Sequence, residues 1–216
     1  MSRLFVKICG ITSVADAECA IDAGADALGF VFWAMSPRRA SVEKAAEISR
    51  ALPTTVRRVG VFVNETRDEM ARAADAVGLD LLQLHGDEPV DAIADLPRPA
   101  LKAVRVGKGF AQEEALRYAA VAAGILVDTR LPGETHMPGG TGVPFDWTLV
   151  KGLASRVSFL MLAGGLGPAN VGEAVREVRP HAVDVSSGVE ALPGRKDPEK
   201  VRAFVRAARE AERTAS

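Results

Sequence analysis

Eight short apolar segments recur along the chain, separated by amphipathic stretches rich in alanine, glutamate and arginine. Their starts lie about 20 to 34 residues apart, which is the rhythm of repeated strand–helix units. Nearly continuous apolar strands are typical of a parallel sheet covered by helices on its outer face. Eight such units favour a closed barrel over an open, doubly wound sheet. The predicted strands are Leu4–Cys9, Asp26–Phe32, Arg58–Asn64, Asp80–His85, Ala100–Val106, Ile125–Asp128, Phe159–Ala163 and Ala182–Ser186.

We therefore predict an α/β protein with a single (β/α)8 TIM barrel domain of parallel strands over residues 1–216. This length is slightly below the ~250 residues typical of such barrels, so long insertions are not expected. No linker, low-complexity tract or run of like charge divides the chain. The alanine-rich, charged tail from about Ala207 is expected to fray.

Composition excludes several classes of function. The net charge is −1 and the pI about 6.3, whereas a nucleic-acid or membrane-surface binder needs a basic excess. A strand begins by Leu4, which leaves no room for a signal peptide, and no apolar run approaches the ~20 residues of a membrane span. Two cysteines do not make a disulfide framework. We expect a cytoplasmic monomer or homodimer with free thiols that acts on a small molecule.

Strand alternation places an unusual set of polar side chains inside the barrel. Side chains at i and i+2 share one face of a strand, so the apolar pair Val6 and Ile8 should face the helices. The polar residues expected to face inward are Lys7, Cys9, Gln83, His85, Asp128, Asp184 and Ser186. Polar groups inside a barrel are costly unless they are paired or functional.

Cys9 and Asp128 stand at the C-terminal tips of two strands, where barrels place their chemistry. A thiol and a carboxyl group facing each other there suggest an acid–base pair. Each residue also has a structural interpretation: Cys9 as a small buried hydrophobe, and Asp128 as a cap of the next turn. Lys7 and Asp184 lie on strands that become neighbours when the barrel closes, which favours an ion pair between them. His85 could orient a loop.

Glycine-rich segments follow the late strands, as in barrels that bind phosphate after strands 7 and 8. Glycine permits close backbone approach to an anion, although ordinary tight turns use the same residues. The candidate phosphate-binding residues are Gly140, Gly164, Gly165, Ser187 and Gly188. Arg38, after the second strand, is suited to holding a carboxylate in a bidentate manner, whereas Arg39 is expected in solvent. The other histidines lack ligand-like spacing, and no metal site is predicted.

Several motifs run in order along nearly the whole chain: Val6–Thr12, Gly24–Phe32, Val59–Asn64, Leu82–Gly86, Gly139–Gly142, Phe145–Trp147, Leu162–Leu166 and Val183–Glu190. Together they make the chain similar to the phosphoribosylanthranilate isomerase family. The resemblance implies that Cys9 is a general base, that Asp128 is a general acid, and that Arg38 holds the anthranilate carboxylate. It further implies an Amadori rearrangement that needs no cofactor. Arg130–Pro138 is longer than the family pattern, which puts the dynamics of this loop in doubt.

This rearrangement requires a particular protonation state of each of the two catalytic groups. Asp128 can donate a proton to the ribose ring oxygen only from its protonated form. Cys9 removes a carbon-bound proton as a thiolate, and we expect the positive charge of Lys7 to lower its pKa. Gln83, His85 and Asp184 are accessory candidates.

Two alternatives use the same barrel differently. A related phosphosugar enzyme, such as an indole-glycerol-phosphate synthase or a Schiff-base aldolase, would act through Lys7 or Lys102. A non-catalytic barrel would bind a phosphometabolite and regulate a partner; it would be expected to lack Cys9 or Asp128, and both are present.

Overall fold

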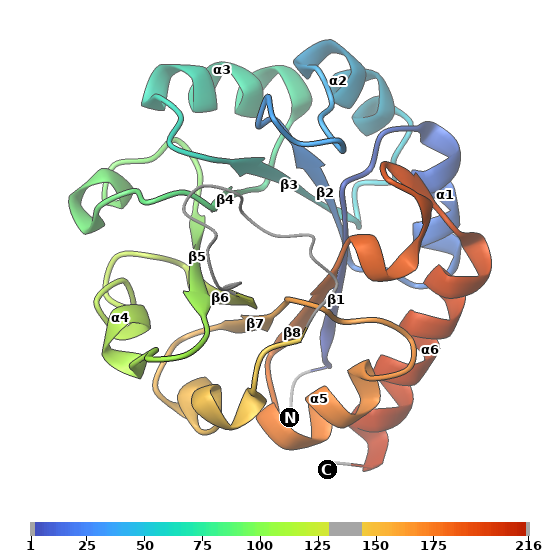
Figure 1. Cartoon of the computed structure of the whole chain (residues 1–216). Helices are drawn as coiled ribbons and strands as arrows, with labels where there is room; N and C mark the ends of the chain where they lie inside the picture. The colour runs from blue at the N-terminus through green and yellow to red at the C-terminus, as the bar shows by residue number, and fades with distance from the viewer. Residues whose placement is uncertain (1–2, 130–143, 215–216) are drawn as a thin grey trace.

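The computed structural model describes residues 3–129 and 144–214. Eight parallel strands form a closed barrel in sequential order, with β1 paired to both β2 and β8. Figure 1 looks into this barrel, with the helices arranged around it. The predicted fold is confirmed, and strand ends differ from the prediction by at most two residues. The strands are β1 (Phe5–Cys9), β2 (Ala27–Val31), β3 (Arg57–Phe62), β4 (Leu81–Leu84), β5 (Ala100–Val106), β6 (Gly124–Thr129), β7 (Leu160–Leu162) and β8 (Ala182–Val185).

Helices fill most connections, and α1, α2 and α3 begin at side-chain caps. The hydroxyl groups of Ser13, Ser41 and Thr66 accept hydrogen bonds from backbone N–H groups in the first turns of α1, α2 and α3. The helices are α1 (Val14–Asp22), α2 (Val42–Arg50), α3 (Arg67–Val77), α4 (Gln112–Leu116), α5 (Val171–Val178) and α6 (Pro198–Thr214). After β8 the chain forms η4 (Ser187–Val189) and a hairpin of β9 (Glu190–Leu192) and β10 (Arg195–Lys196).

Two of the connections between strands have no α-helix among the residues that the structure describes. Among described residues, β4 and β5 are joined only by the 3-10 turn η1 (Val90–Ile93), and the described segment before β7 holds only η2 (Trp147–Val150) and η3 (Leu153–Ser155). Pro89 and Pro97 flank η1, and proline disfavours continuation of a helix. The fold therefore departs here from eight full strand–helix units.

Alternation of side chains is as the sequence predicts. Val6 and Ile8 are buried between the strands and the helices. A separate apolar cluster that includes Leu126 and Met161 fills the inside of the barrel, with Phe5 packed against it. Lys7 is fully buried, so the barrel interior changes from apolar to charged toward the strand tips.

The C-terminal tail is ordered as part of α6, contrary to the expectation that it frays. Ala208 and Ala211 are buried, and Arg209 Nη2 lies 2.6 Å from Asp26 Oδ2 at the start of β2. The Leu4 amide donates to Glu212. The buried alanine face and these charged contacts fix the tail against the barrel. None of the described helices is long and apolar enough to cross a membrane.

Candidate active site

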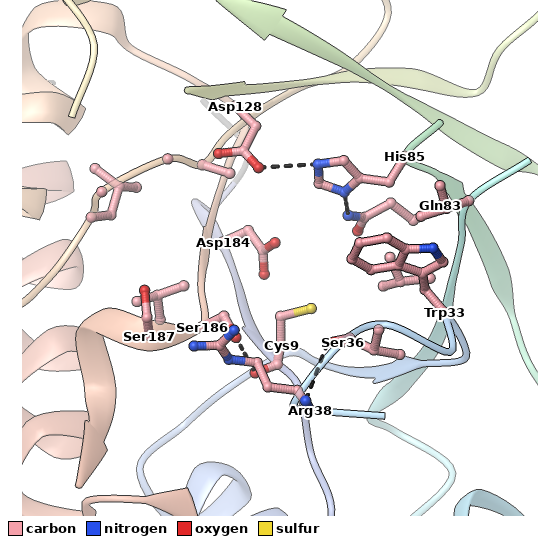
Figure 2. Close-up of a pocket in the computed structure, with 18 residues that line it drawn as sticks. Cys9, Trp33, Ser36, Arg38, Gln83, His85, Asp128, Asp184, Ser186 and Ser187 are labelled. Atoms are coloured by element: carbon pink, nitrogen blue, oxygen red, sulfur yellow. Dashed lines mark hydrogen bonds and ion pairs between the residues drawn. The ribbon is translucent and has the colours of Figure 1, made fainter. Parts of the chain in front are cut away.

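The carboxyl ends of the strands surround a cavity that opens between the loops (Figure 2). About 710 Å³ of empty space, which includes solvent at the open mouth, lies between its walls. Nine of the predicted site residues line it: Cys9, Arg38, Gln83, His85, Asp128, Gly164, Gly165, Asp184 and Ser187. Figure 2 shows Cys9 and Asp128 on opposite sides of this space.

Cys9 lies above a buried ion pair. Lys7 Nζ lies 2.9 Å from Asp184 Oδ1, as expected for neighbouring strands of a closed barrel. Burial alone would lower the pKa of Lys7, but Asp184 and Cys9 outweigh it, and the net pKa is raised. Lys7 therefore remains charged beneath the cavity.

Lys7 acts on the pKa of Cys9 in the expected direction, but it does not decide the net pKa. Burial raises the pKa of the Cys9 thiol, Lys7 opposes this, and Asp184 adds to the increase. The charge of Lys7 is largely matched by its carboxylate partner, so it does not offset the loss of water. In this structure the thiol form of Cys9 is favoured.

Gly29 makes room for the Cys9 side chain. The two residues are paired across β1 and β2. A Cβ atom at position 29 would lie 2.7 Å from Cys9 Sγ, 3.1 Å from Cys9 Cα and 3.1 Å from Lys7 Cε. Sequence reasoning did not single out Gly29, because nothing local indicates which side chain approaches it.

Asp128 is held through both carboxylate oxygens. Oδ1 accepts from the Thr129 N–H at 2.7 Å, so the predicted capping contact is present. Oδ2 lies 3.0 Å from His85 Nε2, and His85 Nδ1 lies 2.9 Å from Gln83 Nε2. These two contacts link Gln83, His85 and Asp128 into one hydrogen-bonded chain, with the imidazole between the amide and the carboxyl group. His85 thus orients the carboxyl group.

Arg38 already has a carboxylate partner within the chain. Its Nε and Nη2 atoms donate to the two oxygens of Glu190 at 2.9 and 2.8 Å. The guanidinium nevertheless lines the cavity. Arg39 is exposed, as expected.

The glycine-rich loops after β7 and β8 lie side by side. Gly164 and Gly165 have positive φ angles of 81° and 62°, which open the first loop toward the cavity. Gly188 does not line the cavity: a Cβ there would fall 1.9 Å from Leu166 O, so its role is close packing of the two loops. Gly140 and Arg130–Pro138 lie outside the described residues.

The structure adds residues that sequence reasoning missed. Val31, Trp33, Val61 and Val63 form an apolar wall of the cavity; the position of Trp33 just after a predicted strand was an available signal. Glu190 belongs to a quoted motif, but its link to Arg38 spans 152 residues. Within the described parts of the chain, no group of three His, Cys, Asp or Glu side chains is placed to hold a metal.

Lys102 does not line this cavity. Its amino group donates to Gly86 O at 2.7 Å and to Glu88 Oε2 at 2.9 Å. Lys7 is also engaged, by Asp184, and has no exposed surface. Neither lysine is placed as a Schiff-base nucleophile at the cavity.

The closed barrel and the cavity between a thiol and a carboxyl group at its strand tips are those of an α/β-barrel enzyme, the class that places its active site at the carboxyl ends of the strands. Residues 6–207 match the model of the N-(5'-phosphoribosyl)anthranilate isomerase family. This chain belongs to that family.

Similar proteins cover nearly the whole chain. N-(5'-phosphoribosyl)anthranilate isomerase from Pseudomonas putida is 50% identical over 211 residues, 98% of this chain and 100% of the relative. The crystal structure of phosphoribosyl anthranilate isomerase from Thermotoga maritima is 44% identical with a TM-score of 0.89, covering 96% and 99% of the two chains. Another structure, 42% identical with a TM-score of 0.86 and covering 96% and 99%, holds reduced 1-(o-carboxyphenylamino)-1-deoxyribulose 5-phosphate.

Proposed function

We propose that this protein isomerises N-(5'-phosphoribosyl)anthranilate to 1-(2-carboxyphenylamino)-1-deoxyribulose 5-phosphate by an Amadori rearrangement in tryptophan biosynthesis. The observation that carries the proposal is that Cys9 and Asp128 face one cavity from opposite sides. Relatives about 50% identical over nearly the full chain carry the name of this isomerase.

Asp128 is the proposed general acid. Protonation of the ring oxygen by its carboxyl group breaks the bond between that oxygen and C1, and the anthranilate nitrogen forms an iminium with C1. His85 Nε2, 3.0 Å from Oδ2, fixes the orientation of the carboxyl group. Such positioning is required because proton transfer needs hydrogen-bond contact.

Cys9 is the proposed general base. The iminium acidifies the proton on C2, and the thiolate removes it to give an enolamine. The positive iminium lies close to the sulfur at this step, which favours the thiolate just when it is needed. The enolamine then takes a proton at C1 and loses that of the C2 hydroxyl, so the product is an isomer of the substrate. We propose that no cofactor takes part.

The ends of the substrate have separate places in this proposal. The phosphate is assigned to Gly164, Gly165 and Ser187, on the loops after β7 and β8, which Gly188 lets pack closely together. The carboxylate is assigned to Arg38. The apolar wall described above suits the aromatic ring.

The test is the decay of substrate fluorescence after addition of the purified protein. We expect decay that depends on enzyme concentration and is competitively slowed by inorganic phosphate. Binding of phosphoribosylanthranilate without decay would instead support the non-catalytic, phosphometabolite-binding barrel. Size-exclusion chromatography with light scattering tests the expectation of a monomer or homodimer.

A further inference from the structure

A charged cluster borders the cavity on the side of the loop after β2. It consists of Arg38, Glu190 and Lys196, which come from that loop, from β9 and from β10. Glu190 contacts Arg38 through both of its carboxylate oxygens. Its Oε1 also lies 2.9 Å from Lys196 Nζ. Glu190 and Lys196 are buried, with exposures of 8% and 3%, whereas Arg38 reaches the cavity (Figure 2).

The net charge and the hydrogen-bond geometry of the cluster together leave the terminal edge of the Arg38 guanidinium able to bind an anion. Two cations and one anion give a net charge of +1. Glu190 occupies the Nε–Nη2 edge of the guanidinium, so Nη1 and the second hydrogen of Nη2 keep their capacity to donate. This terminal edge is planar and can hold a carboxylate through two parallel hydrogen bonds.

Glu190 is itself rigidly held. Its Oε1 also accepts from the Gly194 N–H at 3.3 Å, and its backbone carbonyl accepts from Lys200 Nζ at 2.9 Å. Thr12 Oγ1 donates to Gly194 O at 2.6 Å, which ties the hairpin to the loop after β1. Burial alone would raise the pKa of Glu190, but hydrogen bonds from Arg38 and Lys196 outweigh it and lower the pKa. The carboxylate is therefore ionised and fixed.

Given the proposed function, we infer that Glu190 is a positioning residue that holds Arg38 by its Nε edge, so that the terminal edge receives the substrate carboxylate. Lys196 supports this arrangement in two ways. It fixes the Glu190 carboxylate, and its charge keeps the cluster positive after Glu190 has paired with Arg38. Without Lys196, the pair of Arg38 and Glu190 would be neutral and would attract an anion less strongly.

The binding test uses reduced 1-(o-carboxyphenylamino)-1-deoxyribulose 5-phosphate as the probe, measured by isothermal titration calorimetry. Glu190→Gln should weaken its binding roughly tenfold or more, in the range expected for a damaged charge-assisted hydrogen bond. The KM for phosphoribosylanthranilate should rise in parallel, with kcat changed by less than about threefold. Glu47→Gln, in an exposed ion pair on α2, is the matched control and should change neither.

A double mutant separates positioning from a direct contact. If Glu190 acts only through Arg38, Glu190→Gln should weaken the probe no further in the Arg38→Ala background. An additive loss would overturn the inference. So would unchanged probe binding in the Glu190→Gln single mutant. Tighter binding in that mutant would also overturn it, because Glu190 would then compete with the substrate carboxylate.

Two measurements keep the test decisive if Glu190→Gln does not fold. Lys196→Met should weaken the carboxylated probe several-fold, but not the analogous phenylamino compound that lacks the carboxyl group. In the unsubstituted protein, hydrogen exchange of the Arg38 Nε–H should stay slow after the probe binds, since Glu190 keeps that edge. Exchange accelerated by the probe would overturn the inference. If the unsubstituted protein neither binds the probe nor turns over substrate, the proposed function itself fails.

Discussion

Replacing Gly29 with alanine should displace the thiol of Cys9, the proposed general base, without removing it. The new Cβ would lie 2.7 Å from Cys9 Sγ, whereas ordinary van der Waals contact begins at 3.4 Å. The sulfur must therefore move by about 0.7 Å, and the contacts at 3.1 Å with Cys9 Cα and Lys7 Cε prevent a simple local adjustment. Lys7 cannot give way easily, because it is fully buried and held by Asp184.

A displacement of this size affects rate more than binding. A shift of ~1 Å in a reacting group can cost ~10²-fold, so we expect kcat to fall about 100-fold in Gly29→Ala. Overpacking should also lower the free energy of unfolding by about 1–3 kcal/mol. Initial rates from substrate fluorescence, urea unfolding and calorimetry with the reduced product analogue separate these effects. Affinity for the analogue should change little.

Gly172→Ala provides the matched control. Gly172 lies in α5, and the nearest atom to an added Cβ is 3.5 Å away. We expect unchanged kcat and a gain in unfolding free energy of up to about 1 kcal/mol, since alanine favours a helix over glycine. Folded Gly29→Ala protein with kcat within threefold of the unsubstituted value would refute the idea that Gly29 positions the thiol.

Further predictions concern the acid–base pair and a buried ion pair. Cys9→Ser and Asp128→Asn should each lower kcat by at least ~10²–10⁴-fold while the thermal unfolding temperature stays close to that of the unsubstituted protein. Because burial raises the pKa of Cys9, its thiolate fraction grows with pH, and in a Cys19→Ser background the rate of alkylation by iodoacetamide should still be rising at about pH 9; an alkylation rate that levels off by about pH 8 would contradict this. Lys102→Met leaves the buried Glu88 carboxylate without its cation and should cost about 3–5 kcal/mol in urea unfolding. Lys44→Met, in an exposed pair, should cost less than about 1 kcal/mol.

The strand pattern and the inward set of residues could be predicted from the sequence because both depend on local geometry. A strand repeats every two residues, so one apolar pair, Val6 and Ile8, was enough to send Lys7 and Cys9 to the opposite face. The strand tips then placed Cys9 and Asp128 at one mouth. The quoted motifs identified the family, which the comparison over residues 6–207 confirms.

The electrostatic state of the site was decided by the tertiary structure. The pKa of Cys9 depends on its burial and on Asp184, a partner brought close only when the barrel closes. Arg38 and Glu190 are 152 residues apart, and no local pattern predicts their bidentate contact. The space that Gly29 leaves for the thiol likewise exists only between two paired strands. Periodicity fixes which way a side chain points, but burial, charge and close packing depend on neighbours that only the closed fold supplies.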